Sequence, residues 1–265
     1  MADSSLAGKV ALVTGGSRGI GRAIVDRIAA AGALVAVHHS SVADESAGEP
    51  DAVKELVESL TAAGRTAFAV DLDFGDHDDG DRLTEAVVAG LRSHGVEPRL
   101  DIVVNNAGIT SRTPFGQVTG AHVDRLFAVN ARAPFLLLQR VTELLARGAR
   151  VVNVSSGLTR IAEPVDPQQE LAHAMSKAAL EMLTLHLARP LAARGITVNT
   201  VAPGIVDVGD PALSDPVLRD RLAGLSPFGR CGTTDDVADL VEFLVSERSR
   251  WTTGQRVAAS GGAAG

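Results

Sequence analysis

Short apolar runs alternate along the chain with longer segments in which apolar residues recur every three or four positions. The short runs predict buried strands at residues 9–14, 33–37, 66–70, 101–104, 150–154, 196–201 and 256–259. The longer segments predict amphipathic helices at residues 20–31, 53–63, 82–91, 123–146, 172–193 and 235–246. Pro134 and Pro190 predict a break or kink within two of these helices.

The alternation of strand and helix predicts βαβ units and therefore a parallel sheet. Right-handed crossovers place helices on both faces of such a sheet. We therefore expect a doubly wound α/β fold built on a single parallel seven-stranded sheet. No linker rich in Pro, Gly or Ser divides the chain, so residues 1–265 are expected to form one domain.

The composition and charge of the chain limit the kinds of partner that it is expected to bind. The net charge is −7 and no run of Lys or Arg occurs, so a nucleic-acid partner is not expected. No apolar stretch is long enough for a membrane span, and residues 1–8 lack the apolar core of a secretory signal. Cys231 is the single cysteine, and the histidines show no metal-binding spacing, so no metal site is expected. We expect a cytoplasmic protein.

A glycine-rich turn joins the first predicted strand to the first predicted helix. Glycines allow positive φ and close approach of a phosphate to backbone N–H groups, and the helix start favours negative charge. This context predicts a dinucleotide site whose first contacts are Gly15, Ser17, Arg18, Gly19, Ile20 and Gly21.

The spacing of this turn, Thr14-Gly15-xxx-Gly19-x-Gly21, resembles that of the short-chain dehydrogenase/reductase family, a group of Rossmann-fold enzymes. Nearly the whole chain shares the resemblance, in the segments Asn105-Asn106-Ala107-Gly108, Val129-Asn130, residues 199–204, Gly229-Arg230 and residues 253–255. The resemblance implies that Asn106, Ala107 and Gly108 support the adenosine side of the cofactor. It places Pro203, Gly204 and Val206 beside the nicotinamide, although Val206 stands near where the family often has threonine.

The second strand ends in Val37-His38-His39-Ser40-Ser41, without the acid that binds the adenosine ribose in NAD enzymes. Arg18 is a bidentate donor suited to a 2′-phosphate, and His39, Ser40 and Ser41 add further donors. Asp71 and Leu72 resemble the family's contact with the adenine edge. We therefore favour NADPH as the cofactor and leave NADH open.

The catalytic segment departs from the family, which reduces ketones with a serine, a tyrosine and a lysine. Lys177 matches the lysine, but His173 stands at the tyrosine position, and the chain contains no tyrosine. Ser156 is the better match to the serine, although seventeen positions separate it from His173, four more than the family implies. Asn130 resembles the helix asparagine that organises a proton-relay water.

Three interpretations of His173 remain open. It can act as the general acid, although its ring is shorter than a phenol and a nearby lysine cation disfavours imidazolium. Alternatively, the protein donates no proton directly, and the substrate or water protonates the oxyanion. The site can also be inactive in a cofactor-binding regulator or scaffold subunit, because fold does not dictate function. A lyase or epimerase on the same scaffold completes the alternatives.

The function that we expect is an NADPH-dependent ketoreductase acting on a bulky aromatic ketone without a tyrosine acid. The sequence resembles ketoreductases that tailor aromatic polyketide antibiotics. Residues 205–228 contain several prolines and glycines around a short helical piece, and predict a lid over the substrate. The family resemblance also implies a homotetramer packed through residues 115–147 and 172–193.

Overall fold

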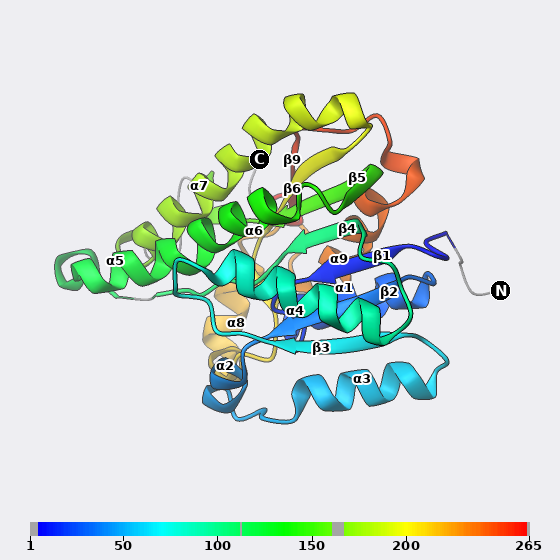
Figure 1. The fold of residues 1–265 in the computed structure, drawn as a ribbon. Helices are drawn as coiled ribbons and strands as arrows, with labels where there is room; N and C mark the ends of the chain where they lie inside the picture. Colours follow the sequence, from blue (N-terminus) through cyan, green and yellow to red (C-terminus); the bar gives the residue numbers. More distant parts are fainter. Residues whose placement is uncertain (1–4, 112, 161–166, 264–265) are drawn as a thin grey trace.

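The computed structural model describes residues 5–111, 113–160 and 167–263 (Figure 1). Seven parallel strands form one sheet in the order β3-β2-β1-β4-β5-β6-β9. Their bounds are β1 Val10–Val13, β2 Leu34–His39, β3 Ala67–Asp71, β4 Leu100–Asn105, β5 Leu145–Val154, β6 Thr197–Pro203 and β9 Arg256–Ala259. The predicted doubly wound fold is confirmed. A further pair, β7 Val206–Asp207 and β8 Gly232–Thr233, forms a separate two-stranded parallel sheet.

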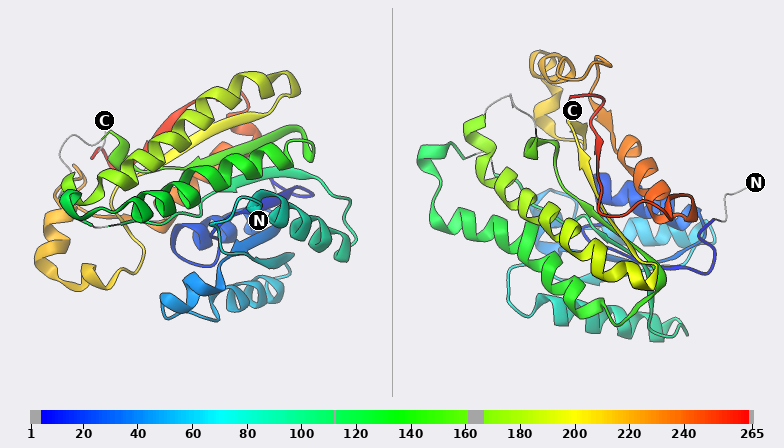
Figure 2. Two further views of the ribbon diagram at one scale, coloured as in Figure 1. Left: turned by 60° about the vertical axis from the view of Figure 1, so that its left-hand side comes forward. Right: turned by 90° about the horizontal axis from the view of Figure 1, so that it is seen from above.

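Helices cover both faces of the large sheet, as the two views in Figure 2 show. One apolar cluster joins the sheet to α1 Gly19–Ala30, α3 Ala52–Ala62 and α9 Thr234–Val245. The other cluster joins the opposite face to α4 Asp79–Ser93, α6 Ala133–Val141 and α7 Pro167–Leu191. Because side chains alternate along a strand, Ala11 and Val13 belong to the first cluster while Val10 and Leu12 belong to the second.

The predicted helix over residues 123–146 is confirmed as far as Val141 and is wrong over its last five residues. The segment consists of α5 Gly120–Phe127, a π-helical turn at Ala128–Arg132 and α6, which ends at Val141. Residues from Leu145 onward belong to β5, because Leu145 pairs with Leu100 before a register shift brings Arg150 opposite Ile102. The predicted break near Pro134 is confirmed, since this proline lies in the first turn of α6.

Two short helices lie in segments that the sequence predicted as irregular. Helix α2 spans Ser41–Ser46, where the Ser40 hydroxyl caps the first turn by accepting from the Ala43 amide. Helix α8 spans Pro216–Ala223, matching the short helical piece expected within the predicted lid. Across the residues that the structure describes, no helix combines the length and apolarity that crossing a bilayer demands.

The order of the strands in the sheet determines where a ligand site is expected. Strand β1 lies between β2 and β4, so the connections leave in opposite directions at the carboxyl ends of β1 and β4. Open α/β sheets bind ligands in the crevice at such a switch point. The glycine turn after β1 and the residues after β4 border this crevice.

Candidate active site

The glycine turn is held against the end of β4 by Thr14 and Asn106. The Thr14 hydroxyl accepts from the Asn106 and Ala107 amides, each at 3.0 Å. The Asn106 side-chain amide donates to the carbonyls of Thr14 (3.0 Å) and Gly15 (2.9 Å). Gly15 has φ of +62°, and a Cβ on Gly21 would overlap the Gly15 carbonyl oxygen. The backbone is therefore packed too closely for any side chain at these two glycines.

A cleft of about 340 Å³ opens over this turn. Its lining includes eleven of the residues predicted to bind the cofactor: Gly15, Ser17, Arg18, Gly19, Ile20, Gly21, Ser40, Leu72, Asn106, Ala107 and Gly108. The lining does not include seven others, which are His39, Ser41, Asp71, Lys177, Pro203, Gly204 and Val206. The cradle of close-packed glycines and backbone amides at a helix start fits a pyrophosphate, so the described residues suit a dinucleotide.

His38 is a cleft residue that the sequence reasoning missed. Its Nδ1 accepts from the Gly15 amide at 3.1 Å, and its Nε2 contacts the Leu72 carbonyl at 3.0 Å. The ring stacks on Phe74 with centroids 4.4 Å apart, and burial lowers its pKa to about 4. His38 is thus neutral, and its hydrogen bond to Gly15 holds the glycine turn in place. Its position at the carboxyl end of an apolar strand was the available signal.

Asp44 is the second residue that the sequence reasoning passed over. It lies in α2, is almost fully buried, and accepts hydrogen bonds from the side chains of Ser17, Arg18 and His39. Phe74, Arg125 and Val208 also line the cleft without having been predicted. Phe74 and Val208 lie in loops and Arg125 lies on α5, so no local motif marks these residues.

Lys177 lies on the buried side of α7. Its Nζ donates to the Val154 carbonyl at 2.9 Å, and burial lowers its pKa to about 8. A Cβ added to Gly108 would lie 2.8 Å from this Nζ and 3.2 Å from the Asn130 Oδ1. Gly108 therefore leaves room for the Lys177 ammonium group and the Asn130 side chain, and the structure brings together the predicted residues Gly108, Asn130 and Lys177.

The backbone of Ile109 joins His173 to Asn130. Asn130, in the π-helical turn, accepts from the Ile109 amide and donates to the Ile109 carbonyl, both at 2.9 Å. The same carbonyl lies 3.0 Å from Nδ1 of His173. Asn130 also donates to Ser176, whose hydroxyl donates to the His173 carbonyl. The π-helical turn thus aims Asn130 at the chain segment that orients the histidine.

His173 is neutral near pH 7 in this environment. Burial and the Lys177 cation lower its pKa to about 4. Because a carbonyl can only accept, Nδ1 carries the ring hydrogen, and Nε2 is left with a lone pair. A group with this protonation can accept a hydrogen bond at Nε2 but holds no proton there to donate.

Ser156 follows Val154 by two residues, next to the carbonyl that holds Lys177. Its Oγ accepts from the Leu158 amide at 3.2 Å, which leaves its hydroxyl hydrogen for another acceptor. The neighbouring Ser155 donates to Glu181 at 2.8 Å, and Arg256 donates to the same Glu181 oxygen at 2.9 Å. Within the longer connection to His173, residues 161–166 lie outside the described residues.

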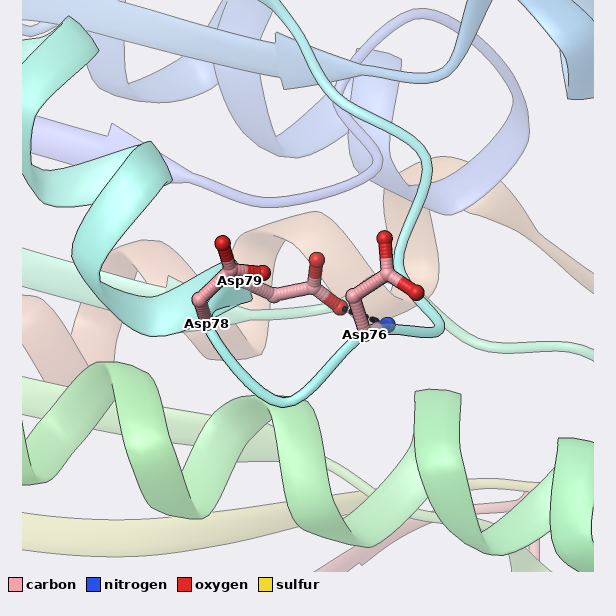
Figure 3. A group of neighbouring side chains, drawn as sticks. All are labelled: Asp76, Asp78 and Asp79. Carbon is pink, nitrogen blue, oxygen red and sulfur yellow. Dashed lines mark hydrogen bonds between the residues drawn. The ribbon is translucent and has the colours of Figure 1, made fainter.

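Three acids, Asp76, Asp78 and Asp79, gather where the loop after β3 enters α4 (Figure 3). Asp79 accepts from the backbone amides of Gly75 (2.6 Å) and Asp76 (2.9 Å), so it closes the loop. The Arg82 guanidinium lies within 4 Å of all three carboxylates. Since Asp79 is bonded to the loop amides and Arg82 partly offsets the charge, we interpret the cluster as part of the turn that leads into α4 and assign no metal to it.

The fold and the site define a class of protein. Residues 15–264 match the family described as enoyl-(acyl carrier protein) reductase. The chain therefore belongs to the short-chain dehydrogenases/reductases and is an oxidoreductase. A curated relative, the 3-oxoacyl-[acyl-carrier-protein] reductase FabG of Staphylococcus aureus, is 35% identical over 258 residues, which is 96% of this chain and 97% of FabG.

Two solved structures are more similar than FabG. The angucycline C-6 ketoreductase LanV with bound NADP is 45% identical, with a TM-score of 0.90, and the match covers 98% of this chain and 96% of LanV. The promiscuous reductase LugOII, which catalyses keto-reduction at C1 during lugdunomycin biosynthesis, is also 45% identical with a TM-score of 0.90. That match covers 98% of this chain and 99% of LugOII.

Proposed function

We propose that this protein is an NADPH-dependent ketoreductase that reduces a ketone of a bulky aromatic polyketide, of the angucyclinone type, in antibiotic biosynthesis. One observation carries the proposal: a neutral histidine without a proton at Nε2 stands beside a buried lysine, where the family places tyrosine. The site retains its cofactor cradle and its lysine but has no donor at the usual position.

The described residues fit the cofactor as follows. The glycine turn and the start of α1 suit the pyrophosphate, and Leu72 with the residues after β4 borders the adenosine side. Lys177 would hold the nicotinamide ribose, as the family resemblance implies. When bound, NADPH supplies a hydride to the carbonyl carbon of the substrate. That LanV is described with bound NADP supports this cofactor.

The proton balance then distinguishes this site from a tyrosine-dependent one. Hydride addition leaves an oxyanion on the former carbonyl oxygen, which must take one proton. His173 has none to give at neutral pH, so we infer that a hydroxyl of the substrate beside the ketone, or water, supplies it. The substrate group or water that gives this proton recovers one from solvent, so the step balances. Nε2 of His173 can accept a hydrogen bond from a water molecule, and Ser156 can donate to the oxygen of the carbonyl.

The substrate class rests on the solved relatives and on the resemblance of the catalytic segment. LanV is also described with NADP and rabelomycin. The tyrosine-less segment resembles the angucyclinone ketoreductase of the simocyclinone pathway. Imidazole is smaller than phenol, so replacing tyrosine by His173 leaves more room for a fused aromatic ring system. These points support a bulky aromatic ketone, and the hydroxyl beside it is inferred from the proton balance.

The direct test follows NADPH oxidation and product formation with an angucyclinone and with its O-methyl ether, in which the hydroxyl beside the ketone is blocked. We expect turnover of the free phenol and at least about a hundredfold loss for the ether, matching the usual contribution of a positioned acid. His173→Tyr should recover activity on the ether, and His173→Phe should not. Equal turnover of both compounds would assign the proton to water instead.

Two results would contradict the proposal. If His173→Phe lost all activity and a pH profile assigned the acid to position 173, the histidine would be the proton donor. If the protein bound NADPH without turning over any polyketide ketone, the alternative of a cofactor-binding regulator or scaffold subunit would stand.

Three further predictions accompany this function. Residues 205–228 form a substrate lid, supported by the exposed apolar side chains of Val208, Val217 and Phe228. The protein is a homotetramer, supported by the exposed Phe135 on α6 and Met182 and Leu185 on α7; light scattering tests this. Its location is cytoplasmic.

A further inference from the structure

The side chains predicted to bind the 2′-phosphate of NADPH already have anionic partners within the protein. Ser17 Oγ donates to Oδ1 of Asp44 at 2.8 Å, and Arg18 Nε donates to the same oxygen at 3.0 Å. His39 Nδ1 lies 2.9 Å from Oδ2 of Asp44, which can only accept. Arg18 and His39, two of the predicted phosphate donors, therefore converge on one carboxylate together with Ser17 of the glycine turn.

The outer donors of this subsite show the same arrangement. Ser40 Oγ donates to Asp73 at 2.9 Å, and the Ser41 amide donates to Asp71 at 2.9 Å. Arg125 is a further cation on the cleft, and its Nη2 lies 2.9 Å from Asp73. The adenosine end of the cleft is thus lined by carboxylates that are paired with the groups expected to bind phosphate.

Asp44 is the most constrained of these acids. Its side chain is 1% exposed, whereas that of its partner Arg18 is 34% exposed and borders the cleft. Both carboxylate oxygens are engaged, so Asp44 is not free to bind the ribose hydroxyls in the manner of an NAD-specific acid. Asp44 lies on α2, beyond the end of β2, which is where NAD-specific enzymes carry the acid that binds the ribose.

We propose that Asp44 is a specificity-determining residue that competes with the 2′-phosphate of NADPH for Ser17, Arg18 and His39. Asp44 therefore weakens the preference of the protein for NADPH over NADH and sets the ratio of the two affinities. This inference rests on the dinucleotide-binding part of the proposed function and is independent of the substrate.

The opposite role, in which Asp44 merely anchors Arg18 for the phosphate, is weaker on charge grounds. A phosphate monoester carries nearly two negative charges at neutral pH, so a carboxylate sharing its arginine repels it strongly. Arg18 also donates from Nη2 to the Ala43 carbonyl at 3.3 Å, and this contact survives the loss of Asp44. Two contacts use two of the five guanidinium N–H donors, so freeing Nε adds a donor for the phosphate.

The test measures the affinities of NADP⁺ and NAD⁺ by titration calorimetry for the wild type and for Asp44→Asn. For the wild type we expect the two dissociation constants to agree within about a hundredfold, and a larger preference for NADP⁺ overturns the proposal. In Asp44→Asn the affinity for NADP⁺ should rise at least about fivefold while that for NAD⁺ changes less than about twofold. A smaller rise, a fall, or an equal change for both dinucleotides overturns it.

Asp51→Asn is the matched control, because Asp51 is exposed, precedes α3 and does not line the cleft. It removes the same charge and should leave both affinities unchanged. The wild-type ratio does not depend on how the variant folds, so it tests the proposal separately. If the wild type bound neither dinucleotide, the proposed function itself would fail; if it bound both and Asp44→Asn did not shift the ratio, the role of Asp44 alone would fail.

Discussion

His173 Nδ1 lies 3.0 Å from the carbonyl oxygen of Ile109, and this contact fixes which ring nitrogen carries the hydrogen. Asn130 donates to the same carbonyl at 2.9 Å, so both of its lone pairs are occupied. The neutral histidine therefore cannot carry its hydrogen on Nε2 without losing this partly buried hydrogen bond. The backbone carbonyl of Ile109, and not the substrate, therefore determines the tautomer of His173.

The two buried histidines make the stability of the folded protein depend on pH. His38 and His173 each have a pKa near 4 in the folded protein against 6.5 when exposed. Between these values the unfolded chain binds more protons, so stability is complete above about pH 6.5 and is lost as pH falls towards 4. Each histidine contributes up to about 3 kcal/mol to this loss.

Urea unfolding from pH 7 to pH 4 measures that dependence. We expect His173→Gln to flatten the curve, since glutamine does not titrate. His77→Gln, at an exposed histidine, should leave the slope as it is in the wild type. A wild-type stability that does not change over this pH range would contradict the prediction.

Lys177→Met should remove both the hydrogen bond to Val154 and the contact expected with the nicotinamide ribose. We expect kcat/KM to fall at least about a hundredfold, equivalent to nearly 3 kcal/mol of transition-state stabilisation. Because the Lys177 cation lowers the pKa of His173, that pKa should rise in the variant, as NMR titration of the imidazole can show.

Lys54→Met provides the control for Lys177→Met. Lys54 lies exposed on α3, and its loss should change neither kcat/KM nor the His173 titration. An unchanged rate in Lys177→Met would show that the lysine is not required at this site.

Gly21→Ala should abolish dinucleotide binding. The new methyl group would overlap the Gly15 carbonyl and the Asn106 side chain, so the turn must move away from its cradle. Overpacking of this kind costs about 1–3 kcal/mol or more, and calorimetry with NADP⁺ should detect no binding. Gly116→Ala, where a Cβ meets open space, should bind as the wild type does. Tight binding by Gly21→Ala would mean that the turn is not the cofactor cradle.

The Glu181–Arg256 pair should be strongly coupled. Their side chains are 15% and 11% exposed and lie 2.9 Å apart, and both contact the Ser155–Thr159 segment. Glu181→Leu or Arg256→Met alone leaves a nearly buried charge unpaired, at a cost of about 3 kcal/mol. The double variant should lose less than the sum of the single losses in urea unfolding. Simple additivity would show that the pair is not coupled.

The sequence predicted most of the fold because a buried parallel sheet leaves a strong pattern. The run at residues 256–259 and the helical piece at residues 216–223 are found with those bounds. The start of β5 at Leu145 escaped prediction, because the residues after it, Ala146-Arg147-Gly148, form no apolar run and lie where the register with β4 shifts. Tertiary pairing, and not local preference, makes them a strand.

The parts of the site that lie in a sequence motif could be predicted, whereas the parts that long-range contacts form could not. The glycine turn follows from its place between a strand and a helix, and the position of Lys177 follows from the resemblance to the family. The role of Asp44 could not be predicted, because its partners, Ser17 and Arg18, lie more than twenty residues away and meet it through the packing of α2 on the turn. The protonation of His173 likewise depends on Ile109, which lies 64 positions earlier in the chain.

Val208 links the expected substrate lid to the dinucleotide cleft. It belongs to the segment expected to cover the substrate, yet it lines the dinucleotide cleft, and a Cβ on Gly19 would touch it at 3.5 Å. If residues 205–228 form the predicted lid, its closure would cover the pyrophosphate turn together with the substrate site. We therefore predict that the dinucleotide binds before this segment closes.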